Sequence, residues 1–120
     1  MNLYNSVQNN DIEQVLFFIE HNPEELSNQH GTYGYTPLML ACKKNNMELV
    51  QLLLEHGADS NDQTYCWNSA LFMTNSINIA ELLIQHEADI HHTNMYQETV
   101  LIYHIRRKNE NLIRDRKSVV

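Results

Sequence analysis

Three histidines stand at matching places along the chain, and imidazole is a common zinc ligand. His21, His56 and His86 each follow a segment rich in leucine, isoleucine or valine. Shared coordination at bonds of about 2 Å needs ligand atoms within about 4 Å of each other, whereas packed helices stand roughly 8–10 Å apart. A hydrogen-bond donor at a helix end explains these histidines better. We therefore expect no metal site.

Two cysteines could act as nucleophiles, but neither has a recognisable catalytic setting. Cys42 falls among apolar residues at helical spacing, which predicts an inert thiol in the core. Cys66 falls in a polar segment that predicts an exposed turn, with His30 or His92 as conceivable neighbours. The chain has no G-x-S-x-G, no glycine-rich phosphate loop and no H-E-x-x-H. We expect no catalytic residues and no cofactor.

The elements that position these residues follow a recurring phrase. Thr36-Pro37-Leu38 predicts a helix start, because Thr36 can cap the helix and Pro37 suits its first turn. Asn45-Asn46 predicts a break before a second helix, and Gly57 predicts the left-handed residue that ends it. The phrase therefore predicts two short helices followed by a turn.

The same phrase occurs several times. It returns from Ser69 to Asp89 and starts again at Thr99. An incomplete copy, which lacks the Thr-Pro-Leu start, precedes it from Asp11 to His21. A period near 33 residues with Thr-Pro-Leu at a helix start resembles the ankyrin-repeat family. The resemblance implies one all-α domain, 1–120, built as a solenoid of helix-turn-helix units with protruding β-hairpin-like turns. We place the repeats at about 1–31, 32–64, 65–94 and 95–120.

The third repeat departs from this pattern. Thr36 to Asp59 spans 24 residues, but Ser69 to Asp89 spans 21, so close to one helical turn is missing near residues 73–76. Glu87 replaces the glycine at the helix end, which costs about 1 kcal/mol if the backbone stays left-handed. Trp67 stands where the family commonly has glycine, and we expect that its backbone need not be left-handed. This repeat is predicted to be the locally least stable part of the stack of repeats.

The last repeat has few apolar residues in its second half. We expect a separate second helix at about 110–117, with a polar outer face that suits a terminal repeat. The polar end favours a natural terminus, and the alternative is a chain cut from a longer array.

The 120 residues carry a net charge of −7, and the charge is unevenly distributed. Residues 1–105 hold 13 acids and two bases, whereas six of the eight basic residues lie between Arg106 and Lys117. The acidic body disfavours nucleic acid and anionic membrane, and favours a partner protein with a basic patch. The basic end is also explained by the dipole of a terminal helix.

Two cysteines do not form a disulfide framework, and no signal peptide or apolar run of roughly 18–20 residues is visible. We expect an intracellular monomer in the cytoplasm, with the nucleus and a host cell left open.

Ankyrin proteins generally bind partners through their turn tips and the concave face of their first helices. Turns normally favour Gly, Asn, Asp or Ser, whereas tyrosine, tryptophan and arginine are enriched at binding hot spots. Thr32, Cys66 and Glu98 occupy further turn positions that we expect to be exposed. The alternative for the aromatic rings is packing against the neighbouring turn. The partner-binding candidates are Tyr33, Tyr35, Lys43, Lys44, Tyr65, Trp67, Asn68, Met95, Tyr96 and Arg107.

The resemblance implies a non-enzymatic protein–protein interaction module, and three narrower hypotheses stay open. A shortened inner helix in one middle repeat is similar to four-repeat inhibitors of cyclin-dependent kinases, although there it lies in the second repeat and here in the third. The asparagine-rich, divergent repeats are compatible with a microbial or viral effector that binds a host protein. A ligand-binding role centred on Cys66 and the histidines is the third.

Overall fold

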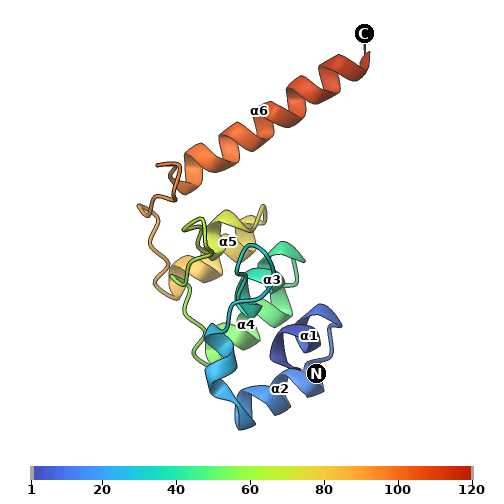
Figure 1. Cartoon of the computed structure of the whole chain (residues 1–120), viewed down its shortest axis with the longest axis vertical. Helices are drawn as coiled ribbons and strands as arrows, with labels where there is room; N and C mark the ends of the chain where they lie inside the picture. The colour runs from blue at the N-terminus through green and yellow to red at the C-terminus, as the bar shows by residue number, and fades with distance from the viewer. Residues whose placement is uncertain (1, 120) are drawn as a thin grey trace.

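The computed structural model describes residues 2–119, and the side chains of residues 2–110. Helix pairs follow one another along the long axis of the molecule, and the last helix projects beyond them (Figure 1). The elements in chain order are α1 (Leu3–Gln8), α2 (Ile12–His21), the 3-10 helix η1 (Pro23–Ser27), α3 (Pro37–Lys43), α4 (Met47–Glu55), the 3-10 helix η2 (Ala70–Phe72), α5 (Ile77–Gln85) and α6 (Val100–Val119).

Side-chain caps start the helices where the sequence predicts them. Thr36 Oγ1 accepts a hydrogen bond from the Met39 amide at 3.3 Å, and the Thr36 amide donates to Met39 Sδ at 3.5 Å. Met39 therefore takes the place of the polar residue that usually completes such a cap. Asp11, Asn46 and Ser76 cap α2, α4 and α5 in the same way.

The break between paired helices is made by asparagine. Asn10 and Asn45 have φ of 57° and 58°, which is the left-handed region that asparagine tolerates better than most residues. Each is followed directly by the cap of the next helix, Asp11 or Asn46. The predicted break at Asn45-Asn46 is confirmed.

The connecting turns are short hairpins that are linked to one another. His30 and Tyr35 exchange backbone hydrogen bonds of 2.8 and 2.9 Å, and form an isolated antiparallel bridge. The Thr64 amide donates to the Asn68 carbonyl at 2.9 Å in the next turn. The Tyr65 amide then donates to the Tyr33 carbonyl at 3.0 Å, across adjacent turns. The helical fold with hairpin-like turns is confirmed, and residues 2–119 contain no strand beyond this bridge.

The core runs through the stack as one layer of aliphatic side chains. It is continuous from the first helix pair to the third, which holds successive repeats together. Its fully buried large members include Leu3, Val7, Val15, Leu38, Leu49, Val50, Leu53, Ile79 and Leu83.

The third repeat has lost most of its inner helix. η2 contains three residues, whereas α3 contains seven. The predicted loss near residues 73–76 is confirmed, because Met73 already caps η2 and Ser76 begins the next helix. The stack therefore has a hollow at this level, between α3 and α6.

We expect fast amide exchange around residues 73–77, above all at Thr74 and Asn75, and faster there than at residues 44–46 of the second repeat. The Met73 and Ser76 amides do have acceptors, the Ala70 carbonyl and Thr74 Oγ1. Lys44, Asn45 and Asn46 donate to helix carbonyls at 3.0 to 3.1 Å, whereas the described bonds include none from the amides of Thr74 and Asn75. Native-state hydrogen exchange would measure this difference. Equal protection of the two segments would show that the third repeat is not locally less stable than the second.

Glu87 is left-handed, with φ of 70°, so the condition for the conformational cost predicted from the sequence is met. Its side chain is exposed, so replacing it by glycine removes strain and little packing. We expect Glu87→Gly to raise the free energy of unfolding by about 1 kcal/mol. Glu81→Gly, at an exposed position inside α5, is the matched control and should lower it by about 1 kcal/mol. A loss of stability in both variants would contradict the assignment of strain to Glu87.

The expectation for Trp67 is wrong. Its φ is 66°, and Gly34 and Gln97 at the matching turn positions have φ of 75° and 60°. A hydrogen bond between the Thr64 amide and the Asn68 carbonyl closes this hairpin. The turn between them requires positive φ at residue 67, whichever side chain is present. The turn therefore fixes the backbone of Trp67, and its ring is 52% exposed.

The expected second helix at 110–117 is also wrong, because α6 is one helix from Val100 to Val119. Lys108 stands where the second repeat has Asn45, and it follows Arg106 and Arg107. Lysine and arginine favour the helix interior, and lysine lacks the local hydrogen bonding that lets asparagine enter the left-handed region. The signal that separates α3 from α4 is therefore missing, and the helix continues.

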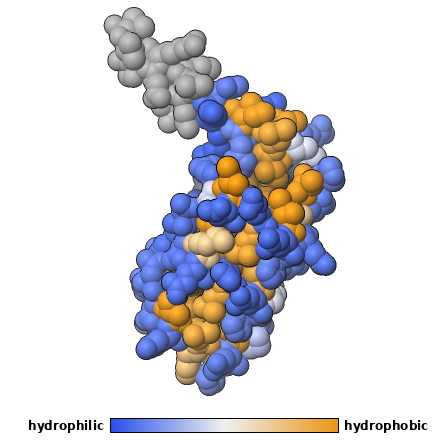
Figure 2. Space-filling view, turned by 180° about the vertical axis from the view of Figure 1, so that it is seen from behind, coloured by the Kyte–Doolittle hydropathy of each residue, from blue (hydrophilic) through white to orange (hydrophobic). Residues whose placement is uncertain are grey.

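One face of α6 is apolar and exposed. Leu101, Ile102 and Ile105 are 69%, 42% and 49% exposed, whereas their counterparts Leu38, Met39 and Cys42 are each 1% exposed. α6 lies at the end of the stack, where no further described helix covers this face (Figure 1). Apolar surface is also visible elsewhere between the polar residues (Figure 2). No helix in the described residues has the length and apolar character to cross a membrane.

Candidate partner-binding groove

The hollow in the third repeat is a groove of about 440 Å³, between the turns and the inner helices. It exists because η2 is one turn long, so α3 and α6 form facing walls with little helix between them. We call it the tyrosine groove. It is lined by Tyr33, Tyr35, Lys43, Thr64, Cys66, Asn68, Phe72, Met73, Asn75, Tyr96, Tyr103, His104 and Arg107.

A lysine and a tyrosine form the α3 wall. Lys43 Nζ donates a hydrogen bond to the Tyr35 hydroxyl at 3.2 Å, and stands 4.4 Å from the centre of that ring. Both features place the ammonium against the ring while it stays exposed to solvent. Tyr33 lies beside Tyr35, with 5.8 Å between ring centres.

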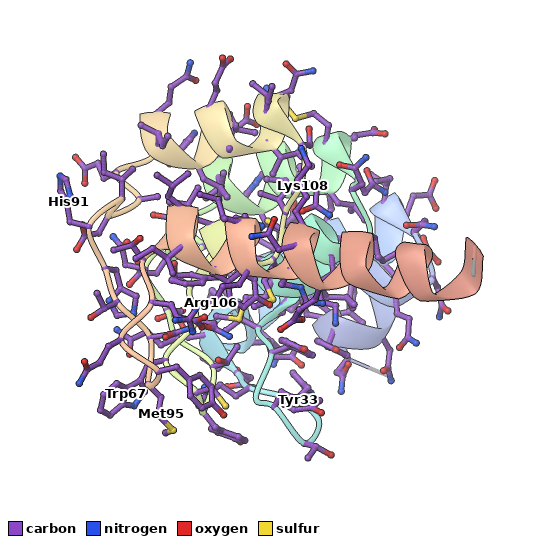
Figure 3. All side chains as sticks on the ribbon, turned by 90° about the horizontal axis from the view of Figure 1, so that it is seen from above. Tyr33, Trp67, His91, Met95, Arg106 and Lys108 are labelled. Carbon is purple, nitrogen blue, oxygen red and sulfur yellow. The ribbon has the colours of Figure 1, made fainter. Side chains whose placement is uncertain are left out.

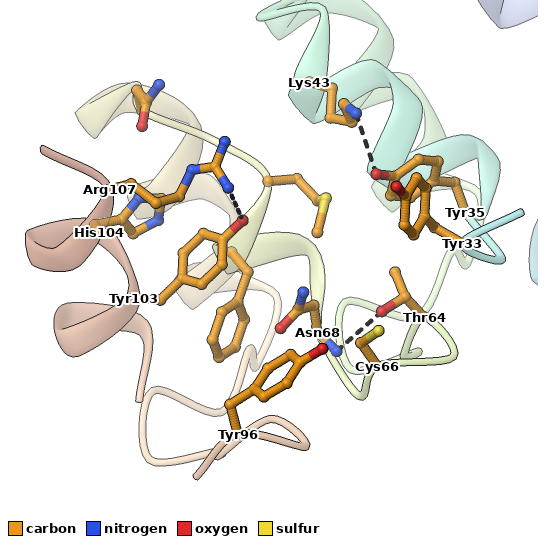
Figure 4. A pocket seen from close by; sticks show the side chains of 13 residues that line it. Tyr33, Tyr35, Lys43, Thr64, Cys66, Asn68, Tyr96, Tyr103, His104 and Arg107 are labelled. Atoms are coloured by element: carbon orange, nitrogen blue, oxygen red, sulfur yellow. Dashed lines mark hydrogen bonds between the residues drawn. The ribbon is translucent and has the colours of Figure 1, made fainter. Parts of the chain in front are cut away.

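A second cation and tyrosine form the α6 wall. Arg107 Nη1 donates to the Tyr103 hydroxyl at 3.1 Å, and the guanidinium lies 5.2 Å from the ring centre. His104 Nε2 is 3.0 Å from the Leu71 carbonyl, which fastens α6 to η2. Figure 4 shows the two cation–tyrosine pairs on opposite sides of the groove.

The floor is fixed and the rim is exposed. Phe72 is buried, and its ring meets Tyr103 edge-on at 5.2 Å between ring centres. Tyr33 and Tyr96 are 58% and 65% exposed at the rim. The groove therefore offers a rigid apolar base and aromatic surface that a partner can cover.

The structure brings some of the sequence-predicted candidates together and leaves others apart. Six line the tyrosine groove, namely Tyr33, Tyr35, Lys43, Asn68, Tyr96 and Arg107. Four lie outside it, namely Lys44, Tyr65, Trp67 and Met95.

Lys44 has a structural role away from the groove. Its Nζ donates to the carbonyls of Val7, at 3.3 Å, and of Gln8, at the end of α1. Helix ends carry unpaired carbonyls and partial negative charge, which this ammonium offsets. Lys44 therefore ties the second repeat to the first.

Tyr65 packs on the preceding turn, as the alternative for the aromatic rings anticipates. A Cβ on Gly34 would lie 2.8 Å from its ring atoms, so the ring covers that glycine directly. Trp67 and Met95 lie near one another on the outer side of the turns, apart from Tyr33 (Figure 3). The Trp67 carbonyl is 2.6 Å from His92 Nε2, which links the turn of residues 64–68 to the segment before the turn of residues 94–98.

Glu98 was predicted to be exposed, and this is wrong, because only 8% of it is accessible. Its carboxylate accepts from Asn94 Nδ2 and from Arg106 Nη1, both at 3.0 Å. Asn94 Nδ2 also donates to Asn68 Oδ1 at 2.9 Å, so part of the Asn68 amide is engaged. These contacts hold the turn of residues 94–98 in place beside the groove.

The thiols and imidazoles have structural surroundings. Burial raises the pKa of the Cys42 thiol to about 12, so it stays protonated in the core as predicted. Cys66 is half-buried in the groove, not exposed as predicted. His21 Nδ1 and His56 Nδ1 lie 2.9 and 2.8 Å from carbonyls one turn earlier, which confirms the helix-end role for these two histidines. The described hydrogen bonds include none from the His86 ring. The described residues include no group of three metal-ligand side chains.

Seven residues that line the groove were not among the partner-binding candidates, namely Thr64, Cys66, Phe72, Met73, Asn75, Tyr103 and His104. Phe72, Tyr103 and His104 belong to helices, and in a complete repeat such positions pack against the neighbouring inner helix. The signal that could have found them is the missing turn of the third repeat. A gap in one inner helix uncovers the residues that the next helix turns toward it.

Comparisons with known proteins agree with this architecture. A family model described as ankyrin repeats, in three copies, matches residues 3–94. The crystal structure of the ankyrin repeat domain of Bcl-3, described as a member of the IkappaB protein family, superposes with a TM-score of 0.78 at 29% identity. The match covers 84% of this chain and 45% of that one.

Curated relatives are similar over shorter stretches. The B-cell lymphoma 3 protein homolog of Mus musculus is 33% identical over 88 residues, covering 71% of this chain and 20% of the relative. Ankyrin repeat and SOCS box protein 5 of Homo sapiens is 41% identical over 61 residues, covering 50% and 18%. The E3 ubiquitin-protein ligase XBAT33 of Arabidopsis thaliana is 34% identical over 71 residues, covering 58% and 14%. The match thus spans a fifth or less of each relative.

Proposed function

Because the chain belongs to the ankyrin-repeat family, a family of interaction modules, we propose that it is a non-enzymatic module that binds a partner protein in the tyrosine groove. The observation that carries the proposal is the missing turn of η2. This loss opens a hollow between α3 and α6, and four tyrosines line it. A segment of the partner would enter the groove, and the turn tips would contact the surface around it.

The groove is already assembled before binding. Tyr35 and Tyr103 are each held by a cation, and Phe72 is buried beneath them. Side chains that are fixed in advance lose less conformational entropy on association, which leaves more of the contact energy as affinity. Tyrosine rings also supply large contact areas with few rotatable bonds.

Charge supports a partner with a basic surface around the bound segment. Residues 1–105 carry 13 acids against two bases, and this excess attracts basic proteins during encounter. The attraction decays within about 8 Å at physiological salt, so it acts on association rate more than on final affinity. We propose that the monomer is the binding form and that its partner lies in the cytoplasm.

Affinity capture with matched baits tests this proposal. The wild type would be compared with Tyr33→Ala/Tyr96→Ala, which removes both rim tyrosines. The control is Phe17→Ala/Ile84→Ala, since these side chains are each 49% exposed on the outer helices α2 and α5. Retained proteins from lysates of the source cell would be identified by mass spectrometry.

We expect at least one protein to be retained by the wild type and the control but lost from the groove variant. Each rim tyrosine removed should cost about 1 kcal/mol or more if it acts as an anchor. Equal retention by all three baits would place the partner elsewhere on the molecule and contradict the proposal.

Inhibition of a cyclin-dependent kinase is the second candidate, and the short η2 favours it. A shortened inner helix in a middle repeat is the feature that resembles those inhibitors, here in the third repeat. An assay of a cell-cycle kinase with excess protein tests it. Unchanged kinase activity would remove this candidate and leave the groove proposal standing.

A further inference from the structure

The tyrosine groove differs in charge from the body around it. The residues that line it include Lys43 and Arg107 and no aspartate or glutamate. Lys43 is one of only two bases in residues 1–105, and Arg107 is the second residue beyond this segment. The charged side chains that line this groove are therefore basic, although the protein as a whole is acidic.

Equivalent cations elsewhere in the stack are used to hold the fold together. Lys43 and Arg106 occupy the same place in their repeats, counted from the helix caps Thr36 and Thr99. Arg106 Nη1 forms an ion pair with Glu98 Oε2 at 3.0 Å. In the second repeat that glutamate is replaced by Tyr35, so the Lys43 ammonium meets a neutral hydroxyl where Arg106 meets a carboxylate.

Arg107 has lost its partner through the missing turn. Its counterpart Lys44 donates to the carbonyls that end the inner helix of the preceding repeat. For Arg107 that helix is η2, which stops at Phe72, and the described hydrogen bonds of Arg107 include none to an η2 carbonyl. The guanidinium instead lies against the Tyr103 ring and lines the groove.

Each exposed cation therefore has N–H donors that no protein group accepts in the described contacts, so a ligand can take them in place of water. An ammonium has three N–H donors and a guanidinium has five, and the described contacts give Lys43 and Arg107 one hydrogen bond each, to a phenol. Each phenol accepts from its cation and keeps its own hydrogen for a second partner. A carboxylate would receive an N–H and an O–H from the same wall, and such charge-assisted hydrogen bonds are roughly twice as strong as neutral ones.

From these contacts we infer that the tyrosine groove binds an extended peptide segment with acidic side chains, whose carboxylates meet the Lys43–Tyr35 and Arg107–Tyr103 pairs. This inference rests on the proposed function and specifies the segment that enters the groove. Apolar side chains of the segment pack on Met73 and on the rim tyrosines. The basic surface of the partner then faces the acidic body outside the groove.

Carboxylates fit this arrangement better than a phosphate does. Proteins that recognise phosphate in peptides gather arginines around one group. Here the two cations stand on opposite walls, and each contacts the ring of its own tyrosine, Tyr35 or Tyr103 (Figure 4). Two separate pairs suit carboxylates at two different positions along an extended segment.

A displayed library of random twelve-residue peptides tests the inference. It would be selected on the wild type, on Lys43→Gln/Arg107→Gln, on the groove variant Tyr33→Ala/Tyr96→Ala and on Lys108→Gln. Lys108 is exposed next to Arg107 on α6 but does not line the tyrosine groove, so it controls for loss of one positive charge. Far-ultraviolet circular dichroism would confirm that every variant is folded.

We expect the wild type and Lys108→Gln to enrich peptides that combine aspartate or glutamate with apolar residues. Affinities of the selected peptides, by fluorescence anisotropy, should fall at least about tenfold for Lys43→Gln/Arg107→Gln. Changing the peptide's Glu to Gln should produce a similar loss. Phosphoserine in place of that Glu should not be required for binding.

Two other outcomes would overturn the inference, and they can be told apart. In the first outcome, the selected peptides need Tyr33 and Tyr96 for binding, but they carry no acidic residue, carry only phosphate, or bind Lys43→Gln/Arg107→Gln as well as the wild type. This would refute recognition of carboxylates and leave the groove as the binding site. Enriched peptides that bind the groove variant equally well, or no enriched peptide, would refute the groove itself as a peptide site.

Discussion

Leu53→Ala should lower the free energy of unfolding by about 2–5 kcal/mol, whereas Tyr33→Ala should lower it by less than about 1 kcal/mol. Leu53 is fully buried on α4, in the layer of aliphatic side chains that joins successive repeats. Its loss removes apolar contact and leaves a cavity between helices that cannot close without moving whole repeats. Tyr33 is 58% exposed on a turn.

Urea denaturation followed by circular dichroism would measure both variants under identical conditions. Leu49→Ala, at another fully buried position of α4, should behave like Leu53→Ala. Similar losses for Leu53→Ala and Tyr33→Ala would mean that Tyr33 is part of the packed structure. The rim of the groove would then be a structural element and not a binding surface.

Filling the groove should abolish partner binding without unfolding the chain. Inserting Ala-Ala-Lys between Met73 and Thr74 restores the number of residues that separates Thr36 from Asp59. η2 would then extend toward the length of α3 and occupy the space between Tyr35 and Tyr103. We expect affinity for the captured partner to fall at least about tenfold, which corresponds to about 1.4 kcal/mol.

The same three residues inserted between Asn28 and Gln29 provide the control. Both residues are exposed in the loop that follows η1, and neither lines the groove, although Gln29 Nε2 donates to the Gly34 and Gln63 carbonyls. Binding should be retained there, and thermal unfolding would establish that both insertion variants are folded. Undiminished binding by the groove-filling variant would show that the missing turn is irrelevant to recognition.

Local sequence signals predict the elements of the fold well. Thr36-Pro37, Asn45 and Gly57 each determine their own backbone conformation, because capping and left-handed geometry depend on one residue and its neighbours. The same reasoning located the missing turn by counting residues. It failed at Trp67, where the hairpin imposes positive φ. At Lys108 the error came from extending the repeat pattern to a segment in which the local break signal is absent.

The groove could be predicted only in part, because it depends on contacts between repeats. Lys43 and Lys44 are adjacent and chemically alike, yet one lines the groove and the other caps α1. Helical geometry turns successive side chains by about 100°, so their destinations depend on what each side meets. Tyr103 and His104 become visible only when the neighbouring inner helix is known to be short.

The central claim is that the partner occupies the tyrosine groove, and chemical-shift mapping tests it most directly. The ¹⁵N-labelled protein would be titrated with the partner identified by capture, and backbone amides followed residue by residue. The expected result is that the largest shifts cluster at Tyr33, Lys43, Cys66, Tyr96 and Arg107, with little change along α2, α4 and α5. Shifts that cluster on those outer helices, with the groove amides unmoved, would contradict it.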